Sequence, residues 1–272
     1  MTRAITSLAI LALGAFAQQA NAADMPVKAP LAAPVPSWYG SFIGIHGGYG
    51  WGGDPVRITG ATGVLAPALG VNIPTALASD PQGGLGGVQW GTNWQSGRWV
   101  YGFLSDFSWS DIRDSATVTL NGGVLLGTRT TSAEQRLRWF STSRLRAGYL
   151  VGDNFLLYAS GGLASGDVKA TVTDFVPGAA CTPGTAACLT GSLSKTRWGW
   201  AVGGGTEYLM GPWSAFVDYV HYDLRRLNFS FSDGVNPATL TTSTRFSGEV
   251  VRAGINYHFH WTFFDLLTGG AR

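Results

Sequence analysis

The sequence predicts an all-β protein: an eight-stranded antiparallel up-and-down transmembrane β-barrel with short periplasmic turns and four long extracellular loops. Of the 272 residues only 12% are charged and 39 are glycine, whereas soluble domains carry about 25% charged residues. Glycine, threonine and aromatic residues favour strands and turns over helix. Eight segments show period-two alternation. Short and long connections between them alternate strictly, so that all short ones lie at one end, as in a transmembrane barrel.

The first 22 residues are predicted to be a cleaved signal peptide. Arg3 provides the positive start, "AITSLAILALGAFA" the apolar core, and Ala20-Asn21-Ala22 the small-residue motif, so cleavage is expected between Ala22 and Ala23. A retained membrane anchor is the alternative, but the apolar run is shorter than the ~20 residues that a spanning helix needs. The proline- and alanine-rich residues 23–37 that follow are predicted to form an extended periplasmic leader.

The barrel is predicted to span residues 38–259. Its strands are expected at about 38–50, 84–95, 98–110, 134–149, 155–169, 195–209, 213–225 and 247–259. Short turns are expected at 96–97, 151–154 and 211–212, where glycine suits hairpin geometry. The closing strand should pair with the first one, because an open edge would leave backbone groups facing lipid. Residues 260–272, "HWTFFDLLTGGAR", are predicted to be a tail resting at the inner rim.

The alternation within a strand indicates which face meets lipid. In residues 98–110 the odd positions are mostly aromatic and the even positions small or polar. A soluble sandwich would show a similar alternation, but large aromatics gather near strand ends, as the interfacial girdles of a membrane barrel require. The predicted girdle consists of Trp38, Trp94, Trp99, Trp109, Trp198, Tyr208 and Trp213.

With the aromatics facing outward, charged side chains face the lumen. The predicted lumen network consists of Asp106, Arg144, Arg146, Arg197, Glu207, Asp218 and Arg252. Eight strands enclose an interior just wide enough for side chains to fill. Paired charges are tolerated there whereas isolated ones are costly, so the network is interpreted as a structural plug, with a pore lining as the alternative.

Two cysteines support an exported protein. Cys181 and Cys188 bracket "CTPGTAAC", in which Pro183-Gly184 favours a turn, so a disulfide closing a surface loop is predicted. Two sulfurs without an adjacent histidine argue against a metal site, and no cofactor is predicted. The formal net charge of +2 argues against nucleic acid as a partner.

Seven blocks in order carry a family resemblance: "ADMPVKAP" with "WYGSFIGIHGGYGWG", "GGVQWGTNWQSGRWVYGFLSDFSWSD", "RLRAGYLVGDNFLLYASGGLASG", "TRWGWAVGGGTEYL", "WSAFVDYVHYDL" and "VRAGINYHF". The chain resembles the small outer-membrane β-barrel proteins of Gram-negative bacteria, which include outer-membrane immunogenic, porin-like and haemin-binding surface proteins. It is similar in architecture to the membrane domain of outer-membrane protein A. The resemblance implies an outer-membrane location, no shared catalytic residues, and as partners outer-membrane lipids, lipopolysaccharide and the barrel-assembly machinery. Leu104 stands where the family often has an acidic residue.

The function predicted is that of a structural, surface-exposed barrel with no enzymatic activity, which supports envelope integrity and meets the environment or a host through its loops. Porin-like passage or ligand binding, of haemin for example, is the alternative. A lipid-modifying enzyme is a third hypothesis, in which Tyr219, His221 and Asp223 share one face and His221 acts as a base.

Overall fold

The computed structural model describes residues 37–179, 188–232, 239–262 and 265. The predicted signal peptide, its cleavage site between Ala22 and Ala23, and nearly all of the leader therefore lie outside the described residues. No helix in the described ranges has the length and apolar character needed to cross a membrane.

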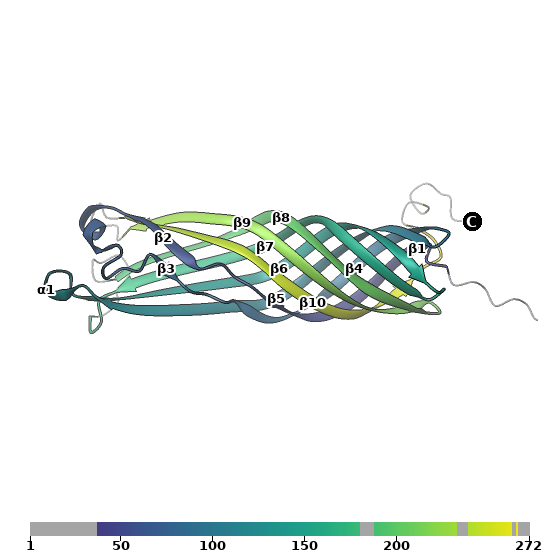
Figure 1. Cartoon of the computed structure of the whole chain (residues 1–272), viewed down its shortest axis with the longest axis horizontal. Coiled ribbons are helices and arrows are strands. Elements are labelled where there is room, and N and C mark those ends of the chain that lie inside the picture. Colours follow the sequence, from purple (N-terminus) through teal and green to yellow (C-terminus); the bar gives the residue numbers. More distant parts are fainter. Residues whose placement is uncertain (1–36, 180–187, 233–238, 263–264, 266–272) are drawn as a thin grey trace, which may run out of the picture. The chain divides into compact units, whose positions relative to one another are not determined.

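In the described part of the chain, eight long strands form a closed ring (Figure 1). They are β1 (Gly40–Trp51), β4 (Gln82–Ser96), β5 (Trp99–Asn121), β6 (Thr128–Val151), β7 (Phe155–Phe175), β8 (Cys188–Met210), β9 (Trp213–Ser232) and β10 (Thr239–His258). Four shorter elements lie in the connections: β2 (Val56–Ala61), the 3-10 helix η1 (Gly63–Ala68), β3 (Ala76–Leu77) and α1 (Gly123–Leu126).

Every neighbouring pair in the ring is antiparallel, and the ring closes between β1 and β10. Phe42 lies opposite His258, and Tyr49 lies opposite Val251, so the predicted pairing of the first and last strands is confirmed. Closure gives the strand backbones internal partners, which lipid requires because it offers none.

The three tight connections lie at one end of the ring, which we name the turn end; the opposite end is the loop end (Figure 1). Gly97 and Gly211 adopt positive φ values of 59° and 63° in two of these turns, a conformation that costs glycine little. The predicted positions of the three tight turns are therefore confirmed to within one residue.

Toward the loop end the strands continue well beyond the predicted segments. β5 reaches Asn121 and β6 starts at Thr128, so the predicted connection between them shrinks to six residues around α1. The extra length is rich in threonine, serine and valine, as in "SATVTLN", and threonine and valine favour extended backbone. β2 pairs with the outer half of β10, and β3 pairs with β2, so part of the first long connection is also strand.

The start of the predicted tail is joined to the ring. The backbone N–H of Ser41 donates to the carbonyl of Trp261 at 2.9 Å, which continues the β1–β10 pairing beyond His258. Asp265 accepts a hydrogen bond from the backbone N–H of Thr262 at 2.8 Å, and this contact lowers the pKa of its carboxyl group. Pairing at this rim thus extends past the predicted end of the barrel at residue 259.

Candidate functional site

The outer face of the ring carries exposed aromatic side chains near both edges of the predicted membrane zone. Six of the seven predicted girdle residues lie there, with exposed fractions between 40% and 65%: Trp94, Trp99, Trp109, Trp198, Tyr208 and Trp213. Exposed aliphatic side chains, such as Leu145 and Val217, occupy the wall between the two edges. A band of apolar side chains bounded by aromatics is the surface that a bilayer solvates.

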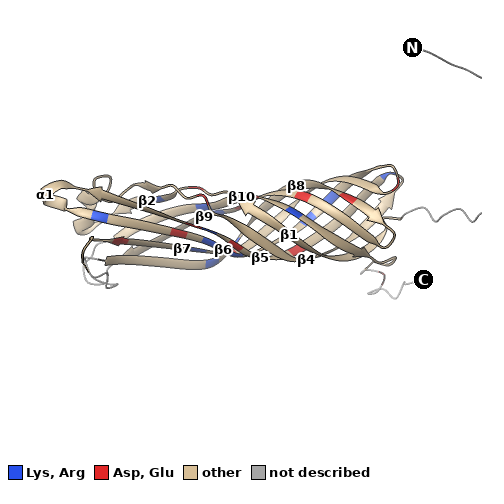
Figure 2. Cartoon of the chain, turned by 90° about the horizontal axis from the view of Figure 1, so that it is seen from below, with Lys and Arg blue, Asp and Glu red and all other residues tan. Residues whose placement is uncertain are grey.

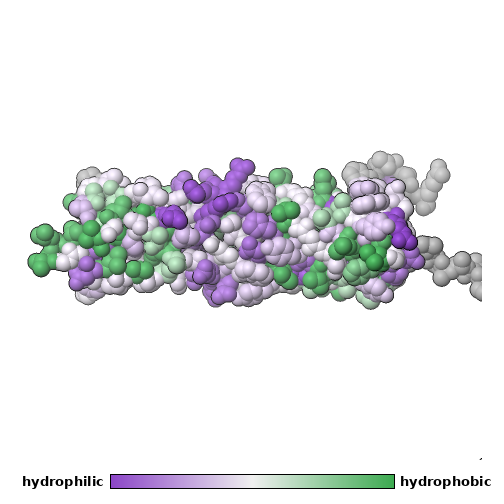
Figure 3. Space-filling model, in the orientation of Figure 1, coloured by the Kyte–Doolittle hydropathy of each residue, from purple (hydrophilic) through white to green (hydrophobic). Residues whose placement is uncertain are grey.

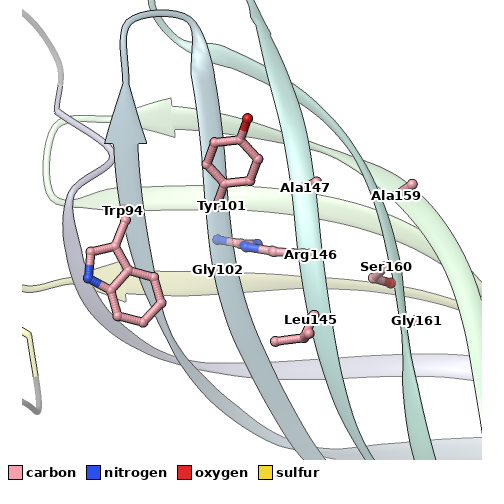
Figure 4. A pocket seen from close by; sticks show the side chains of 9 residues that line it. All are labelled: Trp94, Tyr101, Gly102, Leu145, Arg146, Ala147, Ala159, Ser160 and Gly161. Carbon is pink, nitrogen blue, oxygen red and sulfur yellow. The ribbon is translucent and has the colours of Figure 1, made fainter.

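A shallow furrow crosses this wall near the turn end (Figure 4). Trp94, Tyr101 and Leu145 flank it, and the small residues Ala147 and Gly161 form its floor. Its volume is about 520 Å³ and its lining is almost entirely apolar. Because the furrow faces the lipid side of the wall, it is suited to a lipid acyl chain.

Trp38 is not part of the girdle, contrary to the sequence prediction. Its side chain is 0% exposed and packs inside the turn end of the ring, edge-on to His258. Its Nε1–H donates to the carbonyl of Asp153 at 3.2 Å. Trp38 precedes the first strand, so the period-two pattern does not determine its orientation. With its neighbours it forms an apolar cluster that fills the turn end: Trp38, Val100, Leu150, Leu156, Tyr158 and Leu209.

Above this cluster lies the first polar layer of the lumen, centred on Arg146 and Glu207. Arg146 Nη1 donates to Glu207 Oε2 at 2.9 Å, and its Nε donates to Asn93 Oδ1 at 2.9 Å. The other carboxylate oxygen, Glu207 Oε1, accepts from Ser214 Oγ at 2.5 Å and from Asn256 Nδ2 at 2.7 Å. Both charges are thus paired and hydrogen-bonded, which is the condition for tolerating buried charge.

The second polar layer joins two arginines to two aspartates. Arg252 Nε and Nη2 donate to the two carboxylate oxygens of Asp218 at 2.9 and 2.8 Å, and Arg252 Nη1 lies 2.9 Å from Asp106. Arg144 Nη2 lies 3.2 Å from Asp218 and 3.4 Å from Asp106. All four side chains are buried. The layer is electrically neutral, and Figure 2 shows such acidic and basic positions interspersed within the turn-end half.

Neutral polar side chains complete this network, and sequence reasoning did not single all of them out. Arg144 also donates to Ser160 at 2.9 Å and to Thr142 at 3.0 Å. Ser214 lies 2.9 Å from His258 Nε2. Small hydroxyl residues give no distinctive signal in an alternating strand. They could have been identified from their inward positions on the same strands as the charged residues.

An apolar stack closes the lumen on the side of the loop end. Phe140 and Tyr222 meet with ring centroids 4.7 Å apart, and Ile112, Leu224 and Phe246 belong to the same buried cluster. A cavity beside Tyr222 and Phe246 measures only about 10 Å³, which is about the room that one water needs. The polar layers are therefore enclosed between two apolar plugs.

Arg197 does not join this network, contrary to the prediction. It lies ten residues before Glu207 on β8, and its Nη2 donates to the carbonyl of Arg226 at 2.6 Å. On β9, Arg226 follows Tyr222 and Leu224, two buried members of the apolar stack that closes the polar layers. The inward parity of Arg197 was predicted from alternation, but alternation carries no information on height along the barrel.

The outward His221 pairs with a different acid from the one considered in the enzyme hypothesis. Its Nδ1 lies 3.2 Å from Glu249 Oε1, and its ring lies 5.3 Å from that of Trp200. Asp223 instead accepts from Arg245 at 2.5 Å and from the backbone N–H of Arg225 at 2.7 Å. Asp223 therefore does not orient His221.

The loop-end half is built from paired strands packed on a third apolar cluster. Val56, Ile58 and Leu77 of β2 and β3 pack there with Val172 of β7 and Leu240 of β10. Cys188 is buried at the start of β8, but Cys181 lies outside the described residues, so the disulfide stays a prediction. Among the described residues, no group of three or more histidine, cysteine, aspartate or glutamate side chains is arranged to hold a metal ion.

A closed eight-stranded ring with an apolar aromatic-edged wall and a polar interior defines an outer-membrane β-barrel. Comparison with known proteins agrees with this class. The 31 kDa outer-membrane immunogenic protein of Brucella melitensis is 32% identical over 262 residues, which cover 90% of this chain and 95% of the relative. The 22 kDa outer membrane protein of Rhizobium leguminosarum bv. viciae is 29% identical over 241 residues, 88% of this chain and 83% of the relative.

The chain belongs to the family of the 31 kDa outer-membrane immunogenic protein. It is therefore a surface β-barrel protein of the outer membrane, and its wall contacts the lipids of that membrane. The crystal structure of the outer membrane protein OprG from Pseudomonas aeruginosa is similar in fold, with a TM-score of 0.44 and 15% identity over 82% of this chain and 97% of that chain. No protein-family model matches the sequence.

Proposed function

We propose that this protein is a sealed barrel that anchors a strand-built outer extension at the cell surface, where the extension meets the environment or a host. The observation that carries the proposal is the filling of the lumen at four heights: the Trp38 cluster, the first and second polar layers, and the Phe140–Tyr222 stack. The structural part of the role is support of the envelope, through a wall that lipid contacts on its whole circumference.

Porin-like passage is the alternative, and it needs a continuous water path. Such a path would require separating Arg252 from Asp218, to which it makes two hydrogen bonds, and displacing the apolar side chains on both sides. Breaking buried ion pairs of this kind costs about 3 to 5 kcal/mol. The geometry therefore favours a closed lumen, and neither a transport nor a catalytic role is proposed.

The position of the outer extension can be tested by labelling intact cells. Leu125 lies in α1 at the loop end and is 96% exposed, whereas Arg98 lies in the turn between β4 and β5. A membrane-impermeant maleimide should label a Leu125→Cys variant on intact cells and should label an Arg98→Cys variant only after the outer membrane is permeabilised. Unmodified protein provides the background from Cys181 and Cys188.

The opposite pattern, with Arg98→Cys labelled on intact cells, would reverse the orientation and contradict the proposal. If the maleimide labelled neither variant on intact cells, the extension would lie away from the cell surface. A heat-modifiability gel on each variant verifies that the barrel has folded before labelling is compared.

A further inference from the structure

On the face that Figure 3 shows, a hydrophilic band lies between the lipid-facing wall and the loop end. Its exposed or half-exposed cations outnumber the nearby acids, and we name them the basic collar: Arg57, Arg113, Arg136, Arg138, Lys169, Lys195, Arg225, Arg226 and Arg245. Some of these charges have acidic partners in the same band. Arg113 and Arg136 share Asp111, and Arg138 pairs with Asp167.

One part of the collar gathers three arginines around a hollow. Arg57 of β2, Arg226 of β9 and Arg245 of β10 line a cavity of about 100 Å³ together with Asp54, Ser243 and Thr244. The strand register places Arg226 directly opposite Arg245 and Arg57 directly opposite Ser243. Like charges that face each other across strands are destabilising by themselves, so this arrangement costs stability unless an anion offsets it.

The acids that the structure describes only partly neutralise this hollow. Asp223 accepts a hydrogen bond from Arg245 at 2.5 Å, and Asp54 accepts one from Ser247 at 3.1 Å. Among the described residues, no carboxylate lies within ion-pair distance of Arg57 or Arg226. Two guanidinium groups are therefore available to an external anion, although Asp54 in the same hollow reduces the net positive charge.

The height of the hollow matches the headgroup region of a bilayer. Trp51, an exposed aromatic at the upper edge of the wall, pairs with Glu249, and Arg245 lies four residues beyond Glu249 on the same strand. A strand rises about 3.3 Å per residue and tilts by about 40° in such a barrel, so Arg245 lies roughly 10 Å above the tryptophan. Phosphate groups of the outer leaflet occupy this depth rather than acyl chains.

We propose that the hollow formed by Arg57, Arg226 and Arg245 binds a phosphate group of the outer-leaflet lipid, namely the phosphorylated diglucosamine of lipopolysaccharide. Guanidinium groups suit this ligand because their planar N–H forks match phosphate oxygens in pairs. Ser243 and Thr244 supply neutral polar atoms beside them. The site rests on the proposed function, since it requires the loop end to face outward.

The test uses folded full-length protein in neutral detergent, titrated with three probes: lipid A that carries its phosphates, lipid A from which they have been removed, and inorganic phosphate. We expect phosphorylated lipid A to bind at least tenfold more tightly than the dephosphorylated form. In an Arg57→Gln/Arg226→Gln double variant this preference should fall about tenfold or more, because loss of the charge-assisted contacts of both guanidinium groups costs at least about tenfold in affinity. Arg57→Lys/Arg226→Lys should retain part of it, since the charge remains but the fork is lost.

Arg98→Gln and Arg113→Gln are matched controls that remove a guanidinium from the turn end and from the opposite part of the collar. An equal loss in Arg113→Gln would mean general charge attraction and would overturn the site. Equal binding of the two lipid A forms, or inorganic phosphate binding as tightly as phosphorylated lipid A, would also overturn it. If Leu125→Cys is labelled on intact cells while these titrations fail, only this site is refuted and the proposed function stands.

Discussion

Replacing Asp218 by leucine is expected to destabilise the barrel by about 3 to 5 kcal/mol, the cost of leaving buried arginines with too few carboxylates. Asp218 binds both Arg252 and Arg144, so its loss leaves those two guanidinium groups to share Asp106 alone. The quantity to measure is the free energy of unfolding in urea, in lipid vesicles, with a gel assay for the folded form. Asp153→Asn, in an exposed turn, should stay within about 0.5 kcal/mol of the original protein.

A compensating variant distinguishes charge imbalance from lost packing. Asp218→Leu/Arg252→Met removes one charge of each sign and leaves Arg144 beside Asp106. Neutral replacement of a buried ion pair is often tolerated, so the double variant should recover more than half of the lost stability. If it is less stable than the single variant, the network acts through shape rather than through charge.

A second large effect is expected on the lipid-facing wall. Leu145 is 71% exposed and lies midway along the apolar band, opposite Phe103 and Gly161 on the neighbouring strands. Leu145→Arg should cost about 2 to 4 kcal/mol of unfolding free energy in lipid vesicles, because an arginine near the bilayer midplane is poorly solvated. The measurement is the same urea titration.

Leu125→Arg is the matched control for this prediction, because Leu125 is also exposed but lies in α1 at the loop end. It should change stability by less than about 0.5 kcal/mol. Comparable losses in both variants would show that the wall around Leu145 is not the membrane-facing surface.

The ring of strands and the orientation of its side chains toward lipid or lumen could be predicted from the sequence, because both depend on local signals. Glycine turns such as Gly97 and Gly211 mark the hairpins, and the alternation around Trp99 and Trp109 separates lipid-facing from lumen-facing positions. The outer halves of the strands were predicted as loops because threonine- and serine-rich stretches such as "SATVTLN" lack a contrast between apolar and polar faces. Such a stretch becomes strand only when a neighbour of the same length pairs with it.

The site was predictable in part for the same reason. The inward parity of Asp106, Arg144 and Arg252 follows from alternation, and the structure brings these residues together. The height of a residue along the barrel axis does not follow from alternation, because the stagger between strands decides which inward residues meet. Arg197 has the same parity yet lies apart from the others, and Trp38 folds into the lumen from a position without alternation. The convergence of Arg57, Arg226 and Arg245 likewise depends on β2 pairing with β10.

The sealed lumen is the central claim, and conductance across a planar lipid bilayer tests it most directly. Folded protein inserted from detergent should leave the membrane without steady current steps, since Trp38, the polar layers and the Phe140–Tyr222 stack fill the path. Heat-unfolded protein provides the baseline for insertion artefacts. Steady open channels of uniform size in most insertions would contradict the account, because a barrel filled in this way has no continuous water path.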